Sequence, residues 1–171
     1  MPATEVVDLK RQAVRLAESV REAGALALSM FKTPLKNWTK GEALSPVSDA
    51  DIAVDVLLRE RLAGDGATIA WLSEESIDDP ARLDARYVWI VDPIDGTRAY
   101  IAGLPDWAVS AALVDNGRPI AACLYAPVSE VTIAGHLFDM FASLTPANDL
   151  TFRYGTNAPT LRVEGLTVAG H

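Results

Sequence analysis

Apolar residues recur every three or four positions over the first thirty residues, and charged residues fill the positions between them. This spacing predicts a long amphipathic helix with one apolar face. The helix is expected to end at Thr33-Pro34, because the residue before a proline resists helical geometry. A second helix is predicted to begin at Ser48 or Asp49. Ser48 with Asp51 makes an approximate capping box, and Gly64 supplies a helix stop.

Short apolar runs bounded by turn residues replace the helical pattern after Gly66 and predict β-strands. An Asp115-Asn116-Gly117 turn favours a hairpin between two of these runs, because Asn-Gly tolerates positive φ. Helices followed by consecutive strands indicate an α+β fold, with two helices packed on one face of a mainly antiparallel sheet of five or more strands. The predicted strands are Thr68–Leu72, Tyr87–Val91, Ala108–Val114 and Pro119–Tyr125, with weaker candidates at Glu130–Ala134, Leu150–Tyr154 and Leu161–Val163.

Composition narrows the class of protein. The 171 residues carry 15 basic and 23 acidic side chains, a net charge of -8 without any basic block, so we expect no nucleic-acid and no membrane partner. The single cysteine, Cys123, excludes an intramolecular disulfide and a thiolate metal cage, and its apolar surroundings predict a buried, inert thiol. The start of the chain lacks the pattern of a signal peptide, and no apolar run is long enough to cross a bilayer, so a cytoplasmic protein is expected.

Acidic residues gather at the ends of the predicted strands. Glu74 follows one strand, and Asp92 and Asp95 follow another. Hard cations such as Mg²⁺ prefer oxygen ligands of this kind. Asp92 and Asp95 cannot both point the same way in a regular strand, but in a turn both carboxylates and the Ile94 carbonyl can converge on one point. The next residues, Arg98–Ala102, form a possible helical turn whose free N–H groups would face a phosphate.

Each of these acidic motifs also has an ordinary explanation. Asp-Pro and Asp-Gly are common turn dipeptides, and Glu74-Glu75 alone would be a solvated strand end. Asp49 and Asp51 could serve only as helix caps. Three acidic clusters at three predicted element boundaries together favour a metal-dependent site. The two histidines, His136 and His171, are too few for a His-based zinc site or a Ser-His-Asp triad.

At these residues the sequence resembles the inositol monophosphatase family of metal-dependent, lithium-sensitive phosphatases. Trp89-Ile-Val-Asp-Pro-Ile-Asp-Gly-Thr97 is similar to the central metal signature of that family. Pro46-Val-Ser-Asp-Ala-Asp51, followed by Asp55, resembles its upstream aspartate segment, and Ser73-Glu-Glu-Ser76 resembles its Gly-Glu-Glu segment. Lys40 lies eleven residues before Asp51, a spacing that also fits. The resemblance extends from the first helix to about Pro127 and implies the N-terminal half of the layered inositol monophosphatase fold.

The resemblance implies a set of metal ligands. Glu74, Asp92 and the backbone carbonyl of Ile94 would hold the first Mg²⁺ ion, and Asp92 and Asp95 would share a second. The family binds two or three such ions per site. Glu75 is expected to act behind the ligands rather than as one of them.

The resemblance also implies catalytic roles. Gly96 and Thr97 would present backbone N–H groups to the substrate phosphate. The Thr97 hydroxyl and Glu74 would orient the attacking water, and Asp51 would accept a hydrogen bond from Thr97. Two or three Mg²⁺ ions beside a phosphate would polarise the phosphoryl group and stabilise the leaving oxygen.

One departure from the family pattern bears on activity. Family members continue into a second half with a Trp-Asp motif whose aspartate completes the second metal site. That motif is absent here, since Trp38, Trp71, Trp89 and Trp107 are followed by Thr, Leu, Ile and Ala. We therefore interpret residues 1–127 as a phosphatase-like metal-binding domain, and residues 128–171 as diverged strands that complete it, with the C-terminal half of the family fold missing.

Three hypotheses follow. The first is a Mg²⁺-dependent phosphomonoesterase, reduced in activity by truncation, that acts on a small phosphorylated metabolite of the inositol monophosphate or 3'(2'),5'-bisphosphonucleotide type. The second is a catalytically weak or inactive metal-binding protein retained for interaction or regulation, and the third is a non-functional gene fragment. Loss of a covering half would expose apolar surface, which favours self-association such as a homodimer.

Overall fold

The computed structural model describes residues 7–42, 44–63, 69–136, 149–152 and 161–164. Helix α1 (Leu9–Met30) is the long N-terminal helix that the periodicity predicts. The Asp8 side chain caps it by accepting a hydrogen bond from the Arg11 N–H (3.2 Å), and Phe31 leaves the helix in an extended conformation. The first six residues of the prediction lie outside the described residues.

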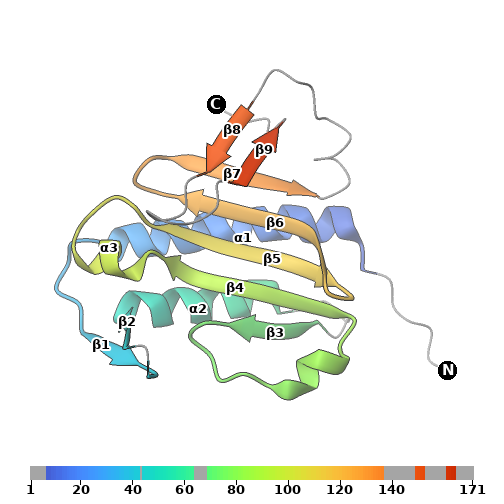
Figure 1. The fold of residues 1–171 in the computed structure, drawn as a ribbon, viewed down its shortest axis with the longest axis horizontal. Helices are drawn as coiled ribbons and strands as arrows, with labels where there is room; N and C mark the ends of the chain where they lie inside the picture. Colours follow the sequence, from blue (N-terminus) through green and yellow to red (C-terminus); the bar gives the residue numbers. More distant parts are fainter. Residues whose placement is uncertain (1–6, 43, 64–68, 137–148, 153–160, 165–171) are drawn as a thin grey trace.

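The main sheet has five strands in the order β3-β4-β5-β6-β7 (Figure 1). Only the β3–β4 pair is parallel and the others are antiparallel, so the prediction of a mainly antiparallel sheet is confirmed. The Asn116-Gly117 turn joins β5 to β6 as predicted, with positive φ at both residues. The strands are β3 (Ala70–Ser73), β4 (Tyr87–Asp95), β5 (Ala108–Asp115), β6 (Arg118–Ala126) and β7 (Val131–His136).

Smaller elements surround this sheet. Strands β1 (Asn37–Lys40) and β2 (Ser45–Ser48) form an antiparallel hairpin that the sequence pattern does not predict. A 3₁₀ helix, η1 (Pro80–Asp84), precedes β4, and the short helix α3 (Thr97–Ile101) follows it. Strands β8 (Asp149–Phe152) and β9 (Leu161–Glu164) pair with each other in a separate sheet and overlap two of the three weaker strand predictions. Most of the remaining segment from 137 to 171 lies outside the described residues.

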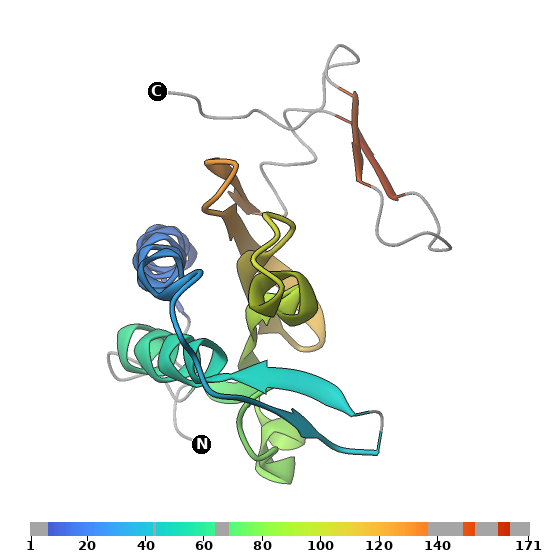
Figure 2. The ribbon, with the colours of Figure 1, turned by 90° about the vertical axis from the view of Figure 1, so that its left-hand side faces the viewer.

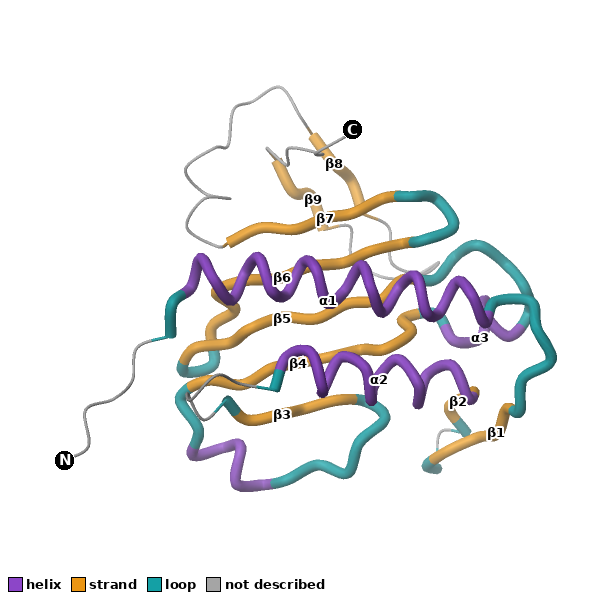
Figure 3. Tube along the Cα trace, turned by 180° about the vertical axis from the view of Figure 1, so that it is seen from behind, coloured by secondary structure: helices purple, strands orange, loops and turns teal. Residues whose placement is uncertain are grey.

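Helices α1 and α2 (Asp49–Leu62) lie side by side on one face of the main sheet, as predicted (Figures 2 and 3). Their apolar faces and the inward-facing residues of β4–β6 form the core, in which Trp89 and Leu113 are buried. Gly24 allows α1 to approach the sheet closely, because a Cβ there would lie 2.4 Å from the ring of Tyr125. The Cys123 thiol is buried as predicted, and burial raises its pKa to about 11.

The opposite face of the sheet is apolar and partly open. Ile90 is exposed although its neighbours on β4, Trp89 and Val91, are buried. A hollow of about 360 Å³ lies on this face, with Asp92, Leu124 and Ile133 among its lining residues. Within the described residues, no helix is long and apolar enough to cross a membrane.

Candidate active site

The end of β4 carries a β-bulge between its two aspartates. Asp92 pairs with Ser110 and Asp95 pairs with Ala108, so a three-residue step on β4 faces a two-residue step on β5. The predicted turn between Asp92 and Asp95 is wrong in one respect, because the strand continues to Asp95. The extra residue of a bulge changes the alternation of side chains, which is why bulges re-aim residues beside active sites. Ile94, inside the bulge, has its side chain buried in the core.

Gly96 turns the chain from β4 into helix α3. Its φ of 93° lies in the left-handed region, and a Cβ at this position would lie 2.5 Å from the Asp106 carbonyl oxygen. Only glycine fits both the conformation and the space. The Gly96 carbonyl then accepts a hydrogen bond from the Tyr100 N–H (3.0 Å), which closes the first turn of α3. This turn places Thr97 directly after the two aspartates.

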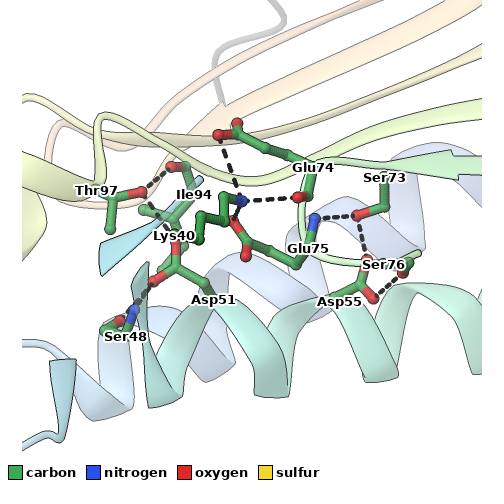
Figure 4. A network of polar contacts seen from close by, with 10 residues as sticks. All are labelled: Lys40, Ser48, Asp51, Asp55, Ser73, Glu74, Glu75, Ser76, Ile94 and Thr97. Carbon is green, nitrogen blue, oxygen red and sulfur yellow. Dashed lines mark hydrogen bonds and ion pairs between the residues drawn. The ribbon is translucent and has the colours of Figure 1, made fainter. Parts of the chain in front are cut away.

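The Thr97 hydroxyl lies between two acceptors (Figure 4). Its oxygen is 2.9 Å from Oδ1 of Asp51 and 2.9 Å from the Ile94 carbonyl oxygen. A hydroxyl has one proton, so it can donate fully to only one of these acceptors at a time. Asp51 is 1% exposed, and its other oxygen accepts hydrogen bonds from both the backbone N–H (2.8 Å) and the hydroxyl (2.6 Å) of Ser48. The predicted capping box of α2 is thus present, and it fixes the carboxylate that faces Thr97.

Lys40 connects the β1–β2 hairpin to the end of β3. Its ammonium group donates to the Glu74 carbonyl oxygen (2.7 Å) and forms an ion pair with Oε1 of Glu75 (2.6 Å). The Glu74 carboxylate lies farther away, 3.6 Å from the ammonium, and its side chain is 52% exposed, against 5% for Glu75. The Glu75 carboxylate is therefore buried and paired with Lys40, whereas the side chain of Glu74 is accessible to solvent. The role of Glu75 behind the metal ligands remains a prediction.

The carboxylates repel one another electrostatically. Burial, followed by the negative charges of Glu74 and Asp95 and smaller contributions from Asp51 and Glu75, raises the pKa of Asp92 to about 7. Burial also raises the pKa of Glu75, although the ion pair with Lys40 opposes this effect. A cation in this cluster would therefore relieve unfavourable charge.

Comparison with known proteins identifies the family of the chain. The sequence model of the inositol monophosphatase family matches residues 9–143, which is most of the chain. The chain belongs to the inositol monophosphatase family. The predicted α+β fold, with its helices on one face of the sheet, is the fold of this family.

Individual relatives are consistent with this assignment. The 3'(2'),5'-bisphosphate nucleotidase CysQ of Shigella flexneri is 40% identical over 123 residues, covering 68% of this chain and 48% of that protein. The crystal structure of CysQ from Bacteroides thetaiotaomicron matches with a TM-score of 0.62 at 28% identity, covering 74% of this chain and 46% of the other. A third structure, an IMPase/NADP phosphatase complexed with Mg²⁺ and phosphate, has a TM-score of 0.66 at 18% identity and covers 77% and 49% of the two chains. At that identity the likeness shows the fold alone. The chain spans about half the length of these relatives.

The donors present fit a Mg²⁺ ion in their chemistry, but they are not gathered into a ready-made site. Glu74, Asp92, Asp95 and the Ile94 carbonyl are hard oxygen donors, the type that Mg²⁺ takes. Within the described part of the chain, however, no three His, Cys, Asp or Glu side chains are grouped closely enough to hold a metal ion. The structure brings together Thr97, Asp51 and Ile94. The metal-ligand roles remain a prediction.

Two contacts of this family member could not be found from the sequence pattern alone. The first is the ion pair of Lys40 with Glu75, which joins residues 35 positions apart. The second is a buried hydrogen-bond network in which Asp55 accepts hydrogen bonds from the hydroxyls of Ser73 and Ser76. Ser73, Glu75 and Ser76 lie in a quoted motif, whereas Lys40 and Asp55 lie near one at a spacing that fits the family, so the available signal was this resemblance.

Proposed function

We propose that this chain is a Mg²⁺-dependent phosphomonoesterase that hydrolyses a small phosphorylated metabolite of the 3'(2'),5'-bisphosphonucleotide type. The observation that carries the proposal is the Thr97 hydroxyl, which lies 2.9 Å from the buried Asp51 carboxylate and directly follows the bulge that bears Asp92 and Asp95. A hydroxyl that is hydrogen-bonded to a fixed carboxylate and close in sequence to several oxygen donors is suited to handling the proton of an attacking water.

Different residues of this chain would bind the cations and activate the attacking water. Bound divalent cations would supply positive charge that polarises the phosphoryl group and stabilises the leaving oxygen. Glu74, Asp92, Asp95 and the Ile94 carbonyl would hold them. Thr97, oriented by Asp51, would align a water for attack on phosphorus and accept its proton as the hydroxyl proton moves to Asp51.

The remaining groups bind substrate and complete the reaction. Gly96 and Thr97 would bind the phosphate through their backbone N–H groups. The new P–O bond forms as the ester P–O bond breaks, and the departing alcohol takes up a proton from solvent.

The relatives support the substrate class. The relative from Shigella flexneri is named a 3'(2'),5'-bisphosphate nucleotidase at 40% identity. An inositol monophosphate is the second substrate class that the family resemblance implies. Self-association through the open apolar face of the sheet also remains a prediction.

The number of ligands argues for slow turnover. The first ion would have Glu74, Asp92 and a backbone carbonyl, whereas the second would have only Asp92 and Asp95 from this chain. Mg²⁺ accepts water in place of a carboxylate, so binding survives with weaker affinity and looser placement. A misplacement of about 1 Å can lower a rate on the order of 100-fold. We therefore expect weak activity that needs millimolar Mg²⁺ and discriminates little among small phosphate monoesters.

The test is phosphate release by the purified chain from adenosine 3',5'-bisphosphate and from inositol 1-phosphate, over a Mg²⁺ titration. The expected result is slow, Mg²⁺-dependent release that is absent in Thr97→Ala and in Glu74→Gln. Asp84→Asn is the matched control, because Asp84 is an exposed carboxylate in η1. Release that is equal in the wild type and Thr97→Ala would refute the proposed role of the hydroxyl.

A further inference from the structure

Asp55 is a buried carboxylate that the proposed mechanism does not use. It lies on α2 one helical turn after Asp51 and is 7% exposed. Its Oδ1 atom accepts a hydrogen bond from the hydroxyl of Ser73, and its Oδ2 atom accepts one from the hydroxyl of Ser76 (2.6 Å) (Figure 4). Both oxygens of the carboxylate are thus directed at the segment that leaves β3.

The same segment carries the two glutamates of the candidate site. The Ser73 oxygen, held by Asp55, also accepts the Glu75 N–H (3.2 Å). The Glu74 N–H donates to the Val91 carbonyl of β4 (3.3 Å). Asp55 therefore accepts hydrogen bonds from both serines that flank the glutamate pair. One of them, Ser73, also accepts a hydrogen bond from the backbone of Glu75.

We propose that Asp55 is a positioning residue, which fixes the Ser73–Ser76 segment so that Glu74 can act as a metal ligand. The proposal rests on the proposed function, because it takes Glu74 as a ligand. Burying a carboxylate is costly unless hydrogen bonds compensate for lost water. Here the hydroxyls that donate to Asp55 belong to two serines of one segment, so the arrangement stabilises that segment in particular. An apolar side chain would fill the same space without that cost, but it could not accept hydrogen bonds from the two serines of the segment.

The position of Asp55 on α2 gives the arrangement a further consequence. Residues four apart in a helix lie on the same face, so Asp51 and Asp55 present carboxylates in the same direction. Asp51 holds Thr97 of the β4–α3 turn, and Asp55 holds the segment after β3. One helix face therefore sets the distance between the hydroxyl proposed for catalysis and the glutamate proposed for metal binding.

The experiment measures binding of Mn²⁺ alone to the metal-free full chain by isothermal titration calorimetry, together with the melting temperature. Loss of a group that orients a metal ligand lowers metal affinity about 10-fold or more, so Asp55→Ala is expected to raise the Kd for Mn²⁺ by at least about 10-fold. Ser76→Ala removes one of the two hydrogen bonds and is expected to weaken binding by a smaller factor, which keeps the test available if Asp55→Ala does not fold.

The matched control is Ser19→Ala. Ser19 is buried in α1 and its hydroxyl donates to the Arg15 carbonyl oxygen (2.7 Å), far in sequence from the segment after β3. This variant is expected to lower the melting temperature and leave the Kd unchanged. If Asp55→Ala and Ser76→Ala also lower only the melting temperature, Asp55 is merely structural and the proposal is overturned.

The two proposals fail in different ways. Wild-type chain that binds Mn²⁺ but releases no phosphate would contradict the proposed function, and a loss of Mn²⁺ affinity in Asp55→Ala would still support the positioning role. Wild-type chain that binds no Mn²⁺ would overturn the positioning role itself.

Discussion

Replacing Asp92 by asparagine should have opposite effects on stability in the absence and in the presence of Mg²⁺. Burial and the neighbouring carboxylates raise the pKa of Asp92 from 3.8 to about 7 in the folded protein. The ionised side chain is therefore unfavourable in the folded state. Asparagine keeps the shape of the side chain and removes the charge, so it relieves the repulsion but removes a proposed metal ligand.

The sign of the pH dependence follows from proton binding. Between about pH 4 and pH 7 the folded protein retains a proton on Asp92 that the unfolded chain has lost. The Asp92 contribution to stability is therefore most favourable below the unfolded pKa and becomes less favourable as the pH rises to about 7. A shift of about 3 pKa units corresponds to an upper limit of about 4 kcal/mol. Solvent screening at this partly exposed group reduces the expected effect to about 1–3 kcal/mol.

Thermal melting of the metal-free chain provides the assay. At pH 8, Asp92→Asn should melt above the wild type by roughly 2–12 °C, since about 1 kcal/mol moves the melting temperature of a chain of this size by about 2–4 °C. Near pH 4 the two should melt together. Addition of Mg²⁺ at about 100 times its Kd should stabilise the wild type by about 2.7 kcal/mol. Asp92→Asn should gain little from Mg²⁺, so its higher melting temperature relative to the wild type should shrink or be reversed.

Asp84→Asn serves as the control for this experiment, because the same chemical change is made at an exposed position in η1. It should match the wild type in both its pH profile and its response to Mg²⁺. If Asp92→Asn and Asp84→Asn gave the same pH profile and the same response to Mg²⁺, the reasoning about the carboxylate cluster would be refuted.

Substitutions at three other residues test single features. Thr97→Ala should lower kcat for phosphate release by about 100-fold or more, and Thr97→Ser should retain most of kcat, since general acid–base groups contribute about 10²–10⁴-fold. Equal rates in the two variants would exclude a catalytic role of the hydroxyl. Gly96→Ala should lower the free energy of unfolding, measured in urea, by about 2 kcal/mol or more, because a positive φ and a Cβ 2.5 Å from the Asp106 oxygen are both unfavourable. An unchanged urea midpoint would show that the turn relaxes to accept the alanine. Tyr100→Phe should lower the free energy of unfolding by about 1–3 kcal/mol, because the buried Ala27 carbonyl loses the Tyr100 hydroxyl as its hydrogen-bond donor (2.7 Å). Thermal melting measures this loss, and an unchanged melting temperature would mean that another donor replaces the hydroxyl.

The helices and the central strands could be predicted because their own residues carry the pattern. The period of apolar residues in α1 and the apolar runs of β4–β6 reflect burial on one face, which does not depend on knowing the partners. The β1–β2 hairpin was missed because its strands have four residues each and β1 is largely exposed, so it carries little apolar signal. The prediction included Ile69 in the strand, but β3 begins at Ala70, where its pairing with β4 starts, and Thr68 lies outside the described residues.

Some contacts of the candidate site could be predicted from the sequence and others could not, whereas the catalytic and metal-ligand roles of its residues remain predictions. The expected hydrogen bond from Thr97 to Asp51 is present, because both residues lie at element boundaries that the fold brings together. The turn expected between Asp92 and Asp95 is a bulge, since pairing with β5 keeps the chain extended beyond the proline. The contact of Lys40 with Glu75 depends on the missed hairpin, so no local pattern could reveal it.

Asp51 shows why the fold and the candidate chemistry of this half-length chain are inseparable. One of its oxygens accepts two hydrogen bonds from Ser48 and so starts α2, while the other accepts the Thr97 hydroxyl. The carboxylate is 1% exposed, so its orientation is set by these contacts rather than by solvent. The helix that covers the sheet thus also orients the hydroxyl. Because α2, β4 and α3 all lie within the described residues, this chain alone brings together the hydroxyl and the carboxylate that we propose for catalysis.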